Sequence, residues 1–309
     1  DATSYDMFDE YVGEATSDDK QDLDLNNSDQ NHRFNFKLEY QATPKDYFMI
    51  RPSLVMQKRK QDLALTDWTV MESVDSLLLN QNTQTDQSVI NTMNEALYMH
   101  KFNNRGHALS VNAKFSYTHT DEDMDLELNN VQSQKNVLQK TISKNDQKSY
   151  TVTASYVVPI SKHMRIKADA GWNYVDGHIK QATETKVNDE QTFSIDSMLC
   201  GRANSHYGGF LSNLSYMYNR KRWNVVGGTE FHSYELWTEN DRERIIYNYN
   251  TLLPFLFIKY LHGNVKWNLQ YKTSQKFPTV YQLLEAINNS NAIMSVKGNN
   301  RLGASYHHN

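Results

Sequence analysis

Apolar and polar residues alternate one for one along much of the chain. Val111 and Phe115, for example, alternate with Ser110 and Lys114. A period of two places successive side chains on opposite faces of a β-strand, so the pattern predicts strands with one apolar and one polar face. Such strands build an antiparallel sheet that has one wet side. The alternation is clearest at residues 34–40, 109–118, 150–158, 164–174 and 265–272.

Turn and loop signals divide the chain into eleven predicted strands. The strands are expected at residues 32–41, 47–60, 88–102, 106–120, 148–158, 163–180, 204–219, 222–238, 244–260, 264–274 and 302–309. Short turns are expected at 42–46, 103–105, 159–162, 220–221 and 261–263, long polar loops at 61–87, 121–147, 181–203 and 275–301, and one short loop near 239–243. Turns and loops therefore gather at opposite ends of an up-and-down meander. Outer-membrane barrels show this asymmetry, with short periplasmic turns and longer extracellular loops.

Aromatic side chains cluster around the short turns. They would form one of the aromatic girdles that mark a membrane interface. The segment from Trp223 to Tyr234 has about the 9–11 residues that a tilted strand needs to cross a bilayer. The alternative is a soluble sheet whose hairpin ends carry aromatic residues, but Lys, Arg and Glu on the polar face of strand after strand favour the membrane. The girdle residues are Tyr40, Tyr47, Phe48, Tyr156, Tyr218 and Trp223.

The expected fold is an all-β, antiparallel, up-and-down transmembrane β-barrel, of which this chain supplies a part. Eleven strands is an odd number, whereas bacterial single-chain barrels have an even number. Unpaired backbone groups at an open sheet edge in lipid cost several kcal/mol each. We therefore expect residues 32–309 to form a partial barrel. Because the first strand runs into a short turn, the acidic segment 1–31 is expected to be an extracellular polar loop.

Composition agrees with strands that turn only one face to lipid. Of 309 residues, 39% are hydrophobic and 22% charged, and the mean hydropathy is -0.74. No apolar run approaches the ~20 residues of a transmembrane helix.

No signal peptide begins at Asp1, so a mature chain or a fragment is expected. A net charge of -4 excludes a basic footprint for nucleic acid. Cys200 is the only cysteine, so neither a disulfide framework nor a cysteine metal site is expected.

No catalytic residue, metal or cofactor is expected from the motifs. The acidic stretch 121–127 is spaced like a calcium loop, but Leu126 and Gln132 stand where an EF-hand needs Gly and Glu. The stretch 22–26 fails the same test. The two histidines at 307–308 point to opposite faces of a strand, so they cannot easily share a metal. The chain contains no Gly-x-Ser-x-Gly, His-Glu-x-x-His or Gly-rich phosphate motif.

Charged residues on the polar face would line a water-filled or plug-filled lumen. The alternative is a solvent-facing sheet whose other face covers a protein core. Ligand contacts are expected in the four long loops, although no single residue stands out as a binding residue. The charges expected to face the lumen are Arg33, Lys37, Glu39, Lys114, Arg165, Lys167, Asp169, Lys266 and Lys272.

The end of the chain carries a family resemblance. Residues 271–283 read YKTSQKFPTVYQL, residues 288–291 read NNSN, and residues 296–309 read VKGNNRLGASYHHN. This stretch resembles the outer-membrane β-barrel family of Bacteroidetes that is related to TonB-dependent receptors. In that family a Tyr-x-Thr strand is followed by Pro and Gln-Leu, then by Asn-Ser-Asn, then by Gly-Asn-Pro-x-Leu. Asn300 stands where Pro is usual, and Ala304 where Pro is frequent, which predicts a less rigid entry to the last strand.

The resemblance implies a barrel of about 22 strands around a plug. Such a receptor lies in the cell outer membrane, binds a small nutrient at its extracellular loops and receives energy through a periplasmic TonB contact. The chain would supply about half of the barrel, without the plug. The implied partners are the lipid bilayer, an unidentified nutrient and TonB acting through the plug, with no nucleic acid and no enzymatic activity.

Two alternatives to the receptor remain. One is a plugless surface barrel, or a β-rich adhesin, with a structural or binding role. The other is an outer-membrane hydrolase whose Ser and His lie on the barrel wall without a local motif.

Overall fold

The computed structural model describes residues 3–7, 17–71, 74–188, 190–240, 243–288 and 296–308. Among these residues no helix is both long and apolar enough to cross a membrane. One short helix, α1 (Val280–Leu283), is present. The strands are β1 (Thr3–Met7), β2 (Ser17–Asn35), β3 (Leu38–Gln41), β4 (Asp46–Met71), β5 (Val74–Lys101), β6 (Ala108–Asn130), β7 (Lys135–Pro159), β8 (Met164–Val187), β9 (Ser194–Ile195), β10 (Gly201–Arg220), β11 (Trp223–Asn240), β12 (Arg244–His262), β13 (Val265–Lys276), β14 (Ile287–Asn288), β15 (Val296–Lys297) and β16 (Ser305–His308).

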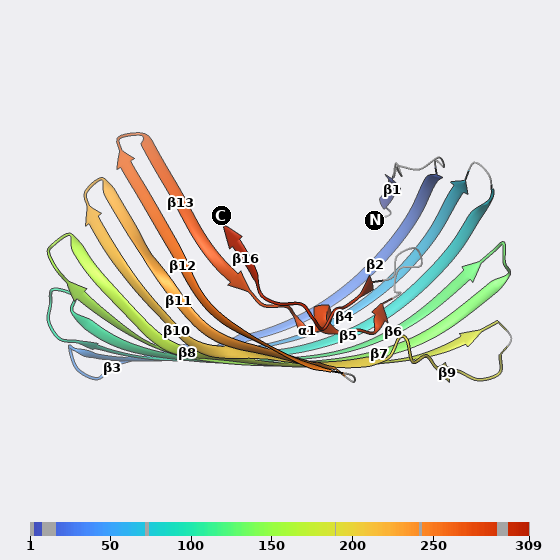
Figure 1. Cartoon of the computed structure of the whole chain (residues 1–309), viewed down its shortest axis with the longest axis horizontal. Helices are drawn as coiled ribbons and strands as arrows, with labels where there is room; N and C mark the ends of the chain where they lie inside the picture. Colours follow the sequence, from blue (N-terminus) through green and yellow to red (C-terminus); the bar gives the residue numbers. More distant parts are fainter. Residues whose placement is uncertain are drawn as a thin grey trace.

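The strands form an antiparallel sheet in which long strands pair with their neighbours in sequence. The order across the sheet is β1-β2-β4-β5-β6-β7-β8-β10-β11-β12-β13-β16. β3 also pairs with β4 and β9 with β8, while β14 and β15 form a separate pair. Figure 1 shows a curved trough with short turns at one end of the strands and the other connections at the opposite end. The predicted all-β meander is confirmed, and each of the eleven expected strands overlaps a strand of the structure.

β2 and β3 are two parts of one long strand that is interrupted at residues 36–37. Both parts pair with β4. Phe36 N donates to Pro52 O at 3.0 Å, but Pro52 has no N–H to donate in return. The missing hydrogen bond explains why the ladder breaks here while the strand continues in the same direction.

One face of the sheet carries a band of exposed apolar side chains. Val152 lies opposite Ala113 on β6 and opposite Trp172 on β8, so the register aligns apolar residues across neighbouring strands. Trp172 is 58% exposed and Leu214 on β10 is 57% exposed. An apolar band of this extent needs an apolar surrounding outside the chain, which the hydrocarbon of a bilayer supplies. We call this side the outer face.

The opposite, concave face of the sheet carries most of the charged residues of the strands within the band, together with buried apolar residues such as Val175 and Leu236. Strands alternate their side chains between the two faces, and the register continues without a shift across the band. The sheet curves around this face, as Figure 1 shows. All nine charges expected to face a lumen lie on this side by their place in the alternation: Arg33, Lys37, Glu39, Lys114, Arg165, Lys167, Asp169, Lys266 and Lys272.

Three predicted long loops are largely β-strand, and their prediction as loops was wrong. β4 and β5 extend through most of 61–87 and leave only 72–73 between them. β6 and β7 likewise leave only 131–134. β8 and β10 also extend into 181–203, and β9 lies between them. The outer face of these extensions is mostly polar, and the concave face mixes polar residues with buried apolar ones such as Leu65, Leu79 and Leu126. This mixture removes the simple alternation without removing the backbone hydrogen bonds.

The expected polar loop at 1–31 also contains sheet. β2 begins at Ser17 and pairs with β4 over its whole length, so the loop prediction was wrong from residue 17 onward. The polar residues of this segment hid the strand for the same reason. Residues 1–2 and 8–16 lie outside the described part of the chain.

An arginine placed on the outer face should destabilise the full-length protein. Leu214→Arg puts a cation near the middle of the apolar band and should lower the free energy of unfolding by about 2–4 kcal/mol. The control Asn213→Arg places the same side chain on the polar concave face and should change it by less than about 1 kcal/mol. Denaturant unfolding in lipid vesicles measures both. Equal losses in the two variants would contradict the assignment of the faces.

Candidate functional site

Residues 277–304 leave the sheet after β13 and lie across its concave face (Figure 1). We call them the crossing segment, of which 289–295 lie outside the described residues. The chain then returns as β16, which pairs antiparallel with β13. The interpretation of 275–301 as an outer loop was therefore wrong, because part of this stretch is apolar and packs onto the sheet.

The crossing segment provides the apolar cluster that packs on the concave face. Ile179 on β8 and Ala203 on β10 are fully buried beneath it. A Cβ at Gly177 would lie 2.7 Å from Val280 Cγ1, so α1 sits where the wall has no side chain. Burial of these side chains removes apolar area from water at about 25 cal/mol per Å². The cluster consists of Ile179, Ala203, Val280, Leu283, Leu284 and Ala286.

An aromatic contact anchors the start of the crossing segment. The ring of Phe277 stacks on Tyr207 of β10 with centroids 4.4 Å apart. It also lies 5.6 Å from the ring of Tyr234 on β11 and 5.7 Å from that of Tyr249 on β12. One ring therefore touches three strands, and aromatic pairs of this kind contribute about 0.5–1.5 kcal/mol each beyond their burial.

Hydrogen bonds close the crossing segment on itself. Thr279 caps α1: Gln282 N donates to Thr279 Oγ1 at 3.4 Å, and Thr279 N donates to Gln282 Oε1 at 2.9 Å. Farther along, Gly298 N donates to Leu284 O at 2.9 Å, and a Cβ at Gly298 would lie 2.2 Å from that oxygen. Glycine is therefore required where the returning chain passes α1.

The end of the crossing segment is bound to β11 and β12. Thr238 Oγ1 donates to Asn300 O at 2.9 Å, and Asn300 is fully buried. Tyr247 OH donates to Arg301 O at 2.8 Å. The guanidinium of Arg301 donates to both carboxylate oxygens of Glu243, with Nε at 3.1 Å and Nη2 at 3.2 Å. These contacts hold the chain at the position where Asn300 replaces the usual proline.

Ion pairs occupy the concave face nearer the short turns. Glu95 on β5 is 8% exposed and accepts from Asn112 Nδ2 at 2.8 Å. Its Oε1 lies 3.7 Å from Lys114 Nζ, and it also pairs with Arg51. A carboxylate at this depth needs such partners, because an uncompensated charge is costly to bury. Paired and hydrated charges on this face are what a lumen requires and what lipid would exclude.

Two depressions flank the crossing segment on the concave side. One, of about 490 Å³, is lined by residues that include Tyr281, Gln282, Asn299 and Leu302. The other, of about 520 Å³, is lined by residues that include Glu285. Lys297 borders both. A polar molecule entering the trough would meet hydrogen-bond donors and acceptors, one aromatic ring, and charges of both signs.

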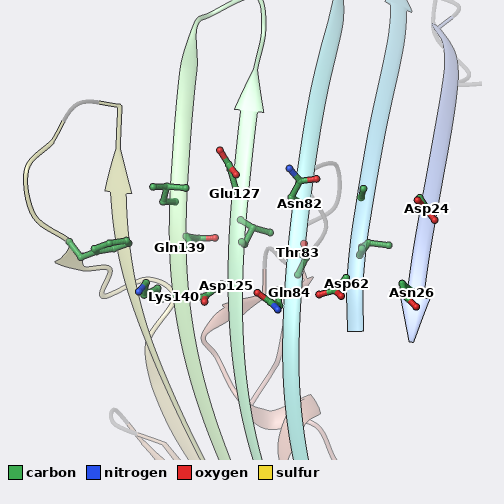
Figure 2. Close-up of a pocket in the computed structure, with 15 residues that line it drawn as sticks. Asp24, Asn26, Asp62, Asn82, Thr83, Gln84, Asp125, Glu127, Gln139 and Lys140 are labelled. Carbon is green, nitrogen blue, oxygen red and sulfur yellow. The ribbon is translucent and has the colours of Figure 1, made fainter. Parts of the chain in front are cut away.

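A third depression, of about 440 Å³, lies on the outer face beyond the apolar band. Figure 2 shows its acidic and amide side chains coming from neighbouring strands. Register places Asp62 beside Gln84, and Gln84 beside Asp125. The acidic stretches 22–26 and 121–127 thus meet here, on strands rather than in loops. The depression faces away from the trough and is not on a path through it.

The described residues contain no group of three or more His, Cys, Asp or Glu side chains able to hold a metal ion. Cys200 Sγ accepts from Thr183 N at 3.1 Å, which gives it a structural hydrogen bond. The paired histidines lie on β16, where His307 Nε2 is 3.1 Å from Ser305 Oγ and His308 Nδ1 is 3.4 Å from Tyr271 OH.

The sequence contained one usable signal for the crossing segment. Val280, Leu283, Leu284 and Ala286 form a short apolar group inside a stretch otherwise predicted as polar loop. That group predicts burial but not its partner, since Ile179 lies about a hundred residues earlier in the chain. The contact depends on the sheet, which brings β8 under α1.

The geometry so far defines a membrane β-barrel wall with an apolar outer face and an occupied polar trough. Residues 100–309 match the model of the Outer membrane protein beta-barrel family. This match covers more than half of the chain, and the chain belongs to that family. The protein is therefore a protein of the outer membrane.

Two solved structures are similar to this chain at low identity. The ferric citrate transporter FecA in its unliganded form is 14% identical, with a TM-score of 0.42 over 87% of this chain and 43% of that one. The alcaligin outer membrane receptor FauA from Bordetella pertussis is 11% identical, with a TM-score of 0.37 over 90% of this chain and 43% of that one. This chain thus spans less than half the length of either. No curated protein matches it.

A disulfide should lock the crossing segment to the wall. An ideal Cβ at Gly177 lies 3.9 Å from Val280 Cβ, within the range of about 3.5–4.5 Å that a disulfide needs. Gly177→Cys with Val280→Cys, in a Cys200→Ser background, should crosslink nearly completely, as measured by thiol titration and by mass spectrometry of the linked peptides. Ser215→Cys with Val280→Cys is the control and should not crosslink. Crosslinking in the control alone would contradict the placement of α1.

Acid should loosen the end of the crossing segment on the loop side of the band. Hydrogen bonds from Arg301 lower the pKa of Glu243 below its usual value. Because the pKa of Glu243 is lower in the folded protein than in the unfolded chain, where it is about 4.3, the ion pair stabilises the fold above that unfolded value. This stabilisation is lost as the pH falls through the lower pKa of the folded protein. A spin label at position 302 should become more mobile below about pH 4. In Glu243→Gln the label should show the same modest increase in mobility at every pH, because the contacts of Asn300 and Tyr247 remain. A pH-independent label in the unsubstituted protein would contradict this.

Proposed function

We propose that this chain forms about half of the barrel wall of a TonB-dependent-type receptor, which binds a small nutrient on its loop side and admits it past a plug. The observation that carries the proposal is the polar trough with its crossing segment. A wall that faces lipid on one side and binds a chain segment on the other surrounds a lumen large enough to hold protein. The resemblance of residues 271–309 to relatives of TonB-dependent receptors supports the same class.

The open edges of the sheet support a barrel wider than this chain. Along most of β2 and in the half of β13 near the short turn, no strand of the described residues pairs with the free edge. Backbone groups left there in hydrocarbon would each cost several kcal/mol, so we propose that further strands pair with them. A barrel of about 22 strands has a lumen that would leak unless plugged. We therefore propose that the complete protein carries a plug.

The lengths of the strands support binding on the loop side. β4 has 26 residues and β5 has 28, whereas about 9–11 residues cross the bilayer. The surplus extends the wall beyond the membrane at the end away from the short turns. In an outer-membrane barrel this end is extracellular. We propose that segment 1–31 is extracellular too, and that the two depressions beside the crossing segment receive the nutrient.

Two other functions make different predictions. A plugless surface barrel or adhesin would bind its partner without energy from the inner membrane. A hydrolase would need an activated nucleophile, and Ser305 beside His307 is the pair to test. Both side chains are exposed, and no carboxylate of the described residues contacts His307. We propose a non-enzymatic role.

Uptake by the full-length protein should depend on TonB. Cells that carry the gene should accumulate one member of a panel of radiolabelled sugars, peptides and metal chelates, and deletion of the gene or of TonB should abolish that uptake. The complete reading frame should encode a plug-sized region and about eleven further strands. Ser305→Ala is the control and should transport normally. Uptake that survives loss of TonB would contradict the proposal that the protein is a TonB-dependent-type receptor. Recovery of the protein in the soluble periplasmic fraction would contradict it too.

A further inference from the structure

Cationic side chains gather on the short turns that join the strands at one end of the sheet. With their flanking residues, these turns cover 42–46, 101–107, 160–163, 220–222 and 261–264. They carry seven lysines and arginines, all exposed, but only one carboxylate, that of Asp46. We call the seven residues the cationic rim: Lys45, Lys101, Arg105, Lys162, Arg220, Lys221 and Arg222.

Backbone hydrogen bonds hold neighbouring turns together along this end of the sheet. Lys101 N donates to Lys45 O at 2.8 Å, so two rim residues from different turns adjoin. Asn219 N donates to His163 O at 2.8 Å, which places the turn after Pro159 beside residues 220–222. Figure 1 shows the short turns following one another around the end of the trough. The rim is therefore a continuous feature of the sheet.

The rim lies beside aromatic side chains of the kind that mark a membrane interface. Arg220 is directly opposite Trp223 and is two residues from Tyr218 on β10, so the three share the outer face. Trp223 is 46% exposed, and its ring lies 4.5 Å from that of Tyr260 on β12. Trp and Tyr rings on the outside of a barrel lie at headgroup level. The turns lie just beyond these rings, where long cationic side chains reach the phosphate layer.

The carboxylates nearest the rim are engaged by other residues. No rim side chain forms a hydrogen bond or an ion pair with any residue that the structure describes. Asp46 accepts from Tyr98 OH at 2.9 Å and lies 2.7 Å from His100 Nδ1. Glu39, on the strand that enters the same turn, lies 2.7 Å from Lys37 Nζ.

The rim is densest at the turn of residues 220–222. Acidic residues are absent from 159–168, 214–229 and 244–284, which include this turn and those on either side of it. The nearest carboxylates along these strands are those of Asp169, 2.9 Å from Lys167 Nζ, and Glu230. The positive potential at this end of the sheet is therefore not offset by the described chain, and an external anion would lower its energy.

We propose that the cationic rim binds the phosphate groups of anionic phospholipid headgroups in the periplasmic leaflet of the outer membrane. Short turns are periplasmic in outer-membrane barrels, and the aromatic rings set the rim at headgroup depth. Lysine supplies a point charge, and arginine a planar fork that can bind a phosphate through two hydrogen bonds. A membrane surface contacts several turns at once, as the extended rim requires. The site concerns how the protein sits in its membrane, and it does not depend on what the protein transports.

Binding of phosphatidylglycerol to the full-length protein in detergent tests the proposal. Native mass spectrometry counts the bound lipids, and titration with a fluorescent phosphatidylglycerol gives the affinity. The variant Lys162→Gln with Arg220→Gln, Lys221→Gln and Arg222→Gln should bind this lipid on the order of 100-fold more weakly. Zwitterionic phosphatidylcholine should bind the unsubstituted protein weakly and should not distinguish it from the variant.

The matched control removes four cations from the concave face, which lipid does not contact. Arg33→Gln with Lys37→Gln, Lys114→Gln and Lys272→Gln should bind phosphatidylglycerol as the unsubstituted protein does. A photoactivatable phosphatidylglycerol should crosslink to peptides that contain residues 219–223, as mapped by mass spectrometry.

Each outcome either supports the proposal or overturns it. Lys162→Arg with Arg220→Lys, Lys221→Arg and Arg222→Lys keeps the charges and should retain binding, which separates loss of the site from loss of the fold. Equal affinity of the glutamine variant and the unsubstituted protein would overturn the proposal, and so would crosslinks confined to the loop side. Displacement of the lipid at comparable concentration by inorganic phosphate, or by soluble peptidoglycan fragments, would assign the rim to those anions and overturn the lipid site.

Discussion

The structure depends on one constraint: no water in the hydrocarbon of a membrane can satisfy a backbone N–H or C=O group. Each such group must pair within the sheet, and the long antiparallel strands of this chain do so with their neighbours in sequence. Once the backbone is paired, the side chains are free to differ on the two faces. The apolar outer face and the polar concave face follow from that freedom, because each strand presents alternate residues to lipid and to the lumen.

The concave face shows how a wall with little apolar content still contains a packed core. The wall provides small residues, such as Gly177 and Ala203, and the crossing segment provides larger ones, such as Val280 and Leu283. The buried cluster therefore joins strands in the middle of the chain to its end. Because Phe277 touches three strands at once, the packing also fixes the crossing segment relative to the wall. Loss of the wall's curvature would separate these contacts, so the core and the trough depend on each other.

Beyond the membrane the same strands continue with different chemistry. Within the band the outer face is apolar, next it carries His–Asp pairs such as His119 with Asp146, and then it carries the cations Lys144 and Lys180. This order follows the polarity of a membrane from hydrocarbon through headgroups to water. The surplus length of the strands therefore gives the protein a polar outer surface beyond the apolar band as well as a taller trough.

The sequence alone determined the strands, the short turns and the side that faces lipid, because all three depend on residues close together in the chain. Alternation at 109–118 or 164–174 is a local property, and it held in the structure. It failed in β2 and the far halves of β4 and β5, where the outer face is polar and the concave face mixes polar residues with apolar ones such as Leu65 and Leu79, so the contrast between the faces is weak. Only the tertiary structure decided that the crossing segment lies in the trough and that the turn of Lys162 lies beside residues 220–222. Those contacts depend on register between distant strands, and register is set by the pairing of the whole sheet.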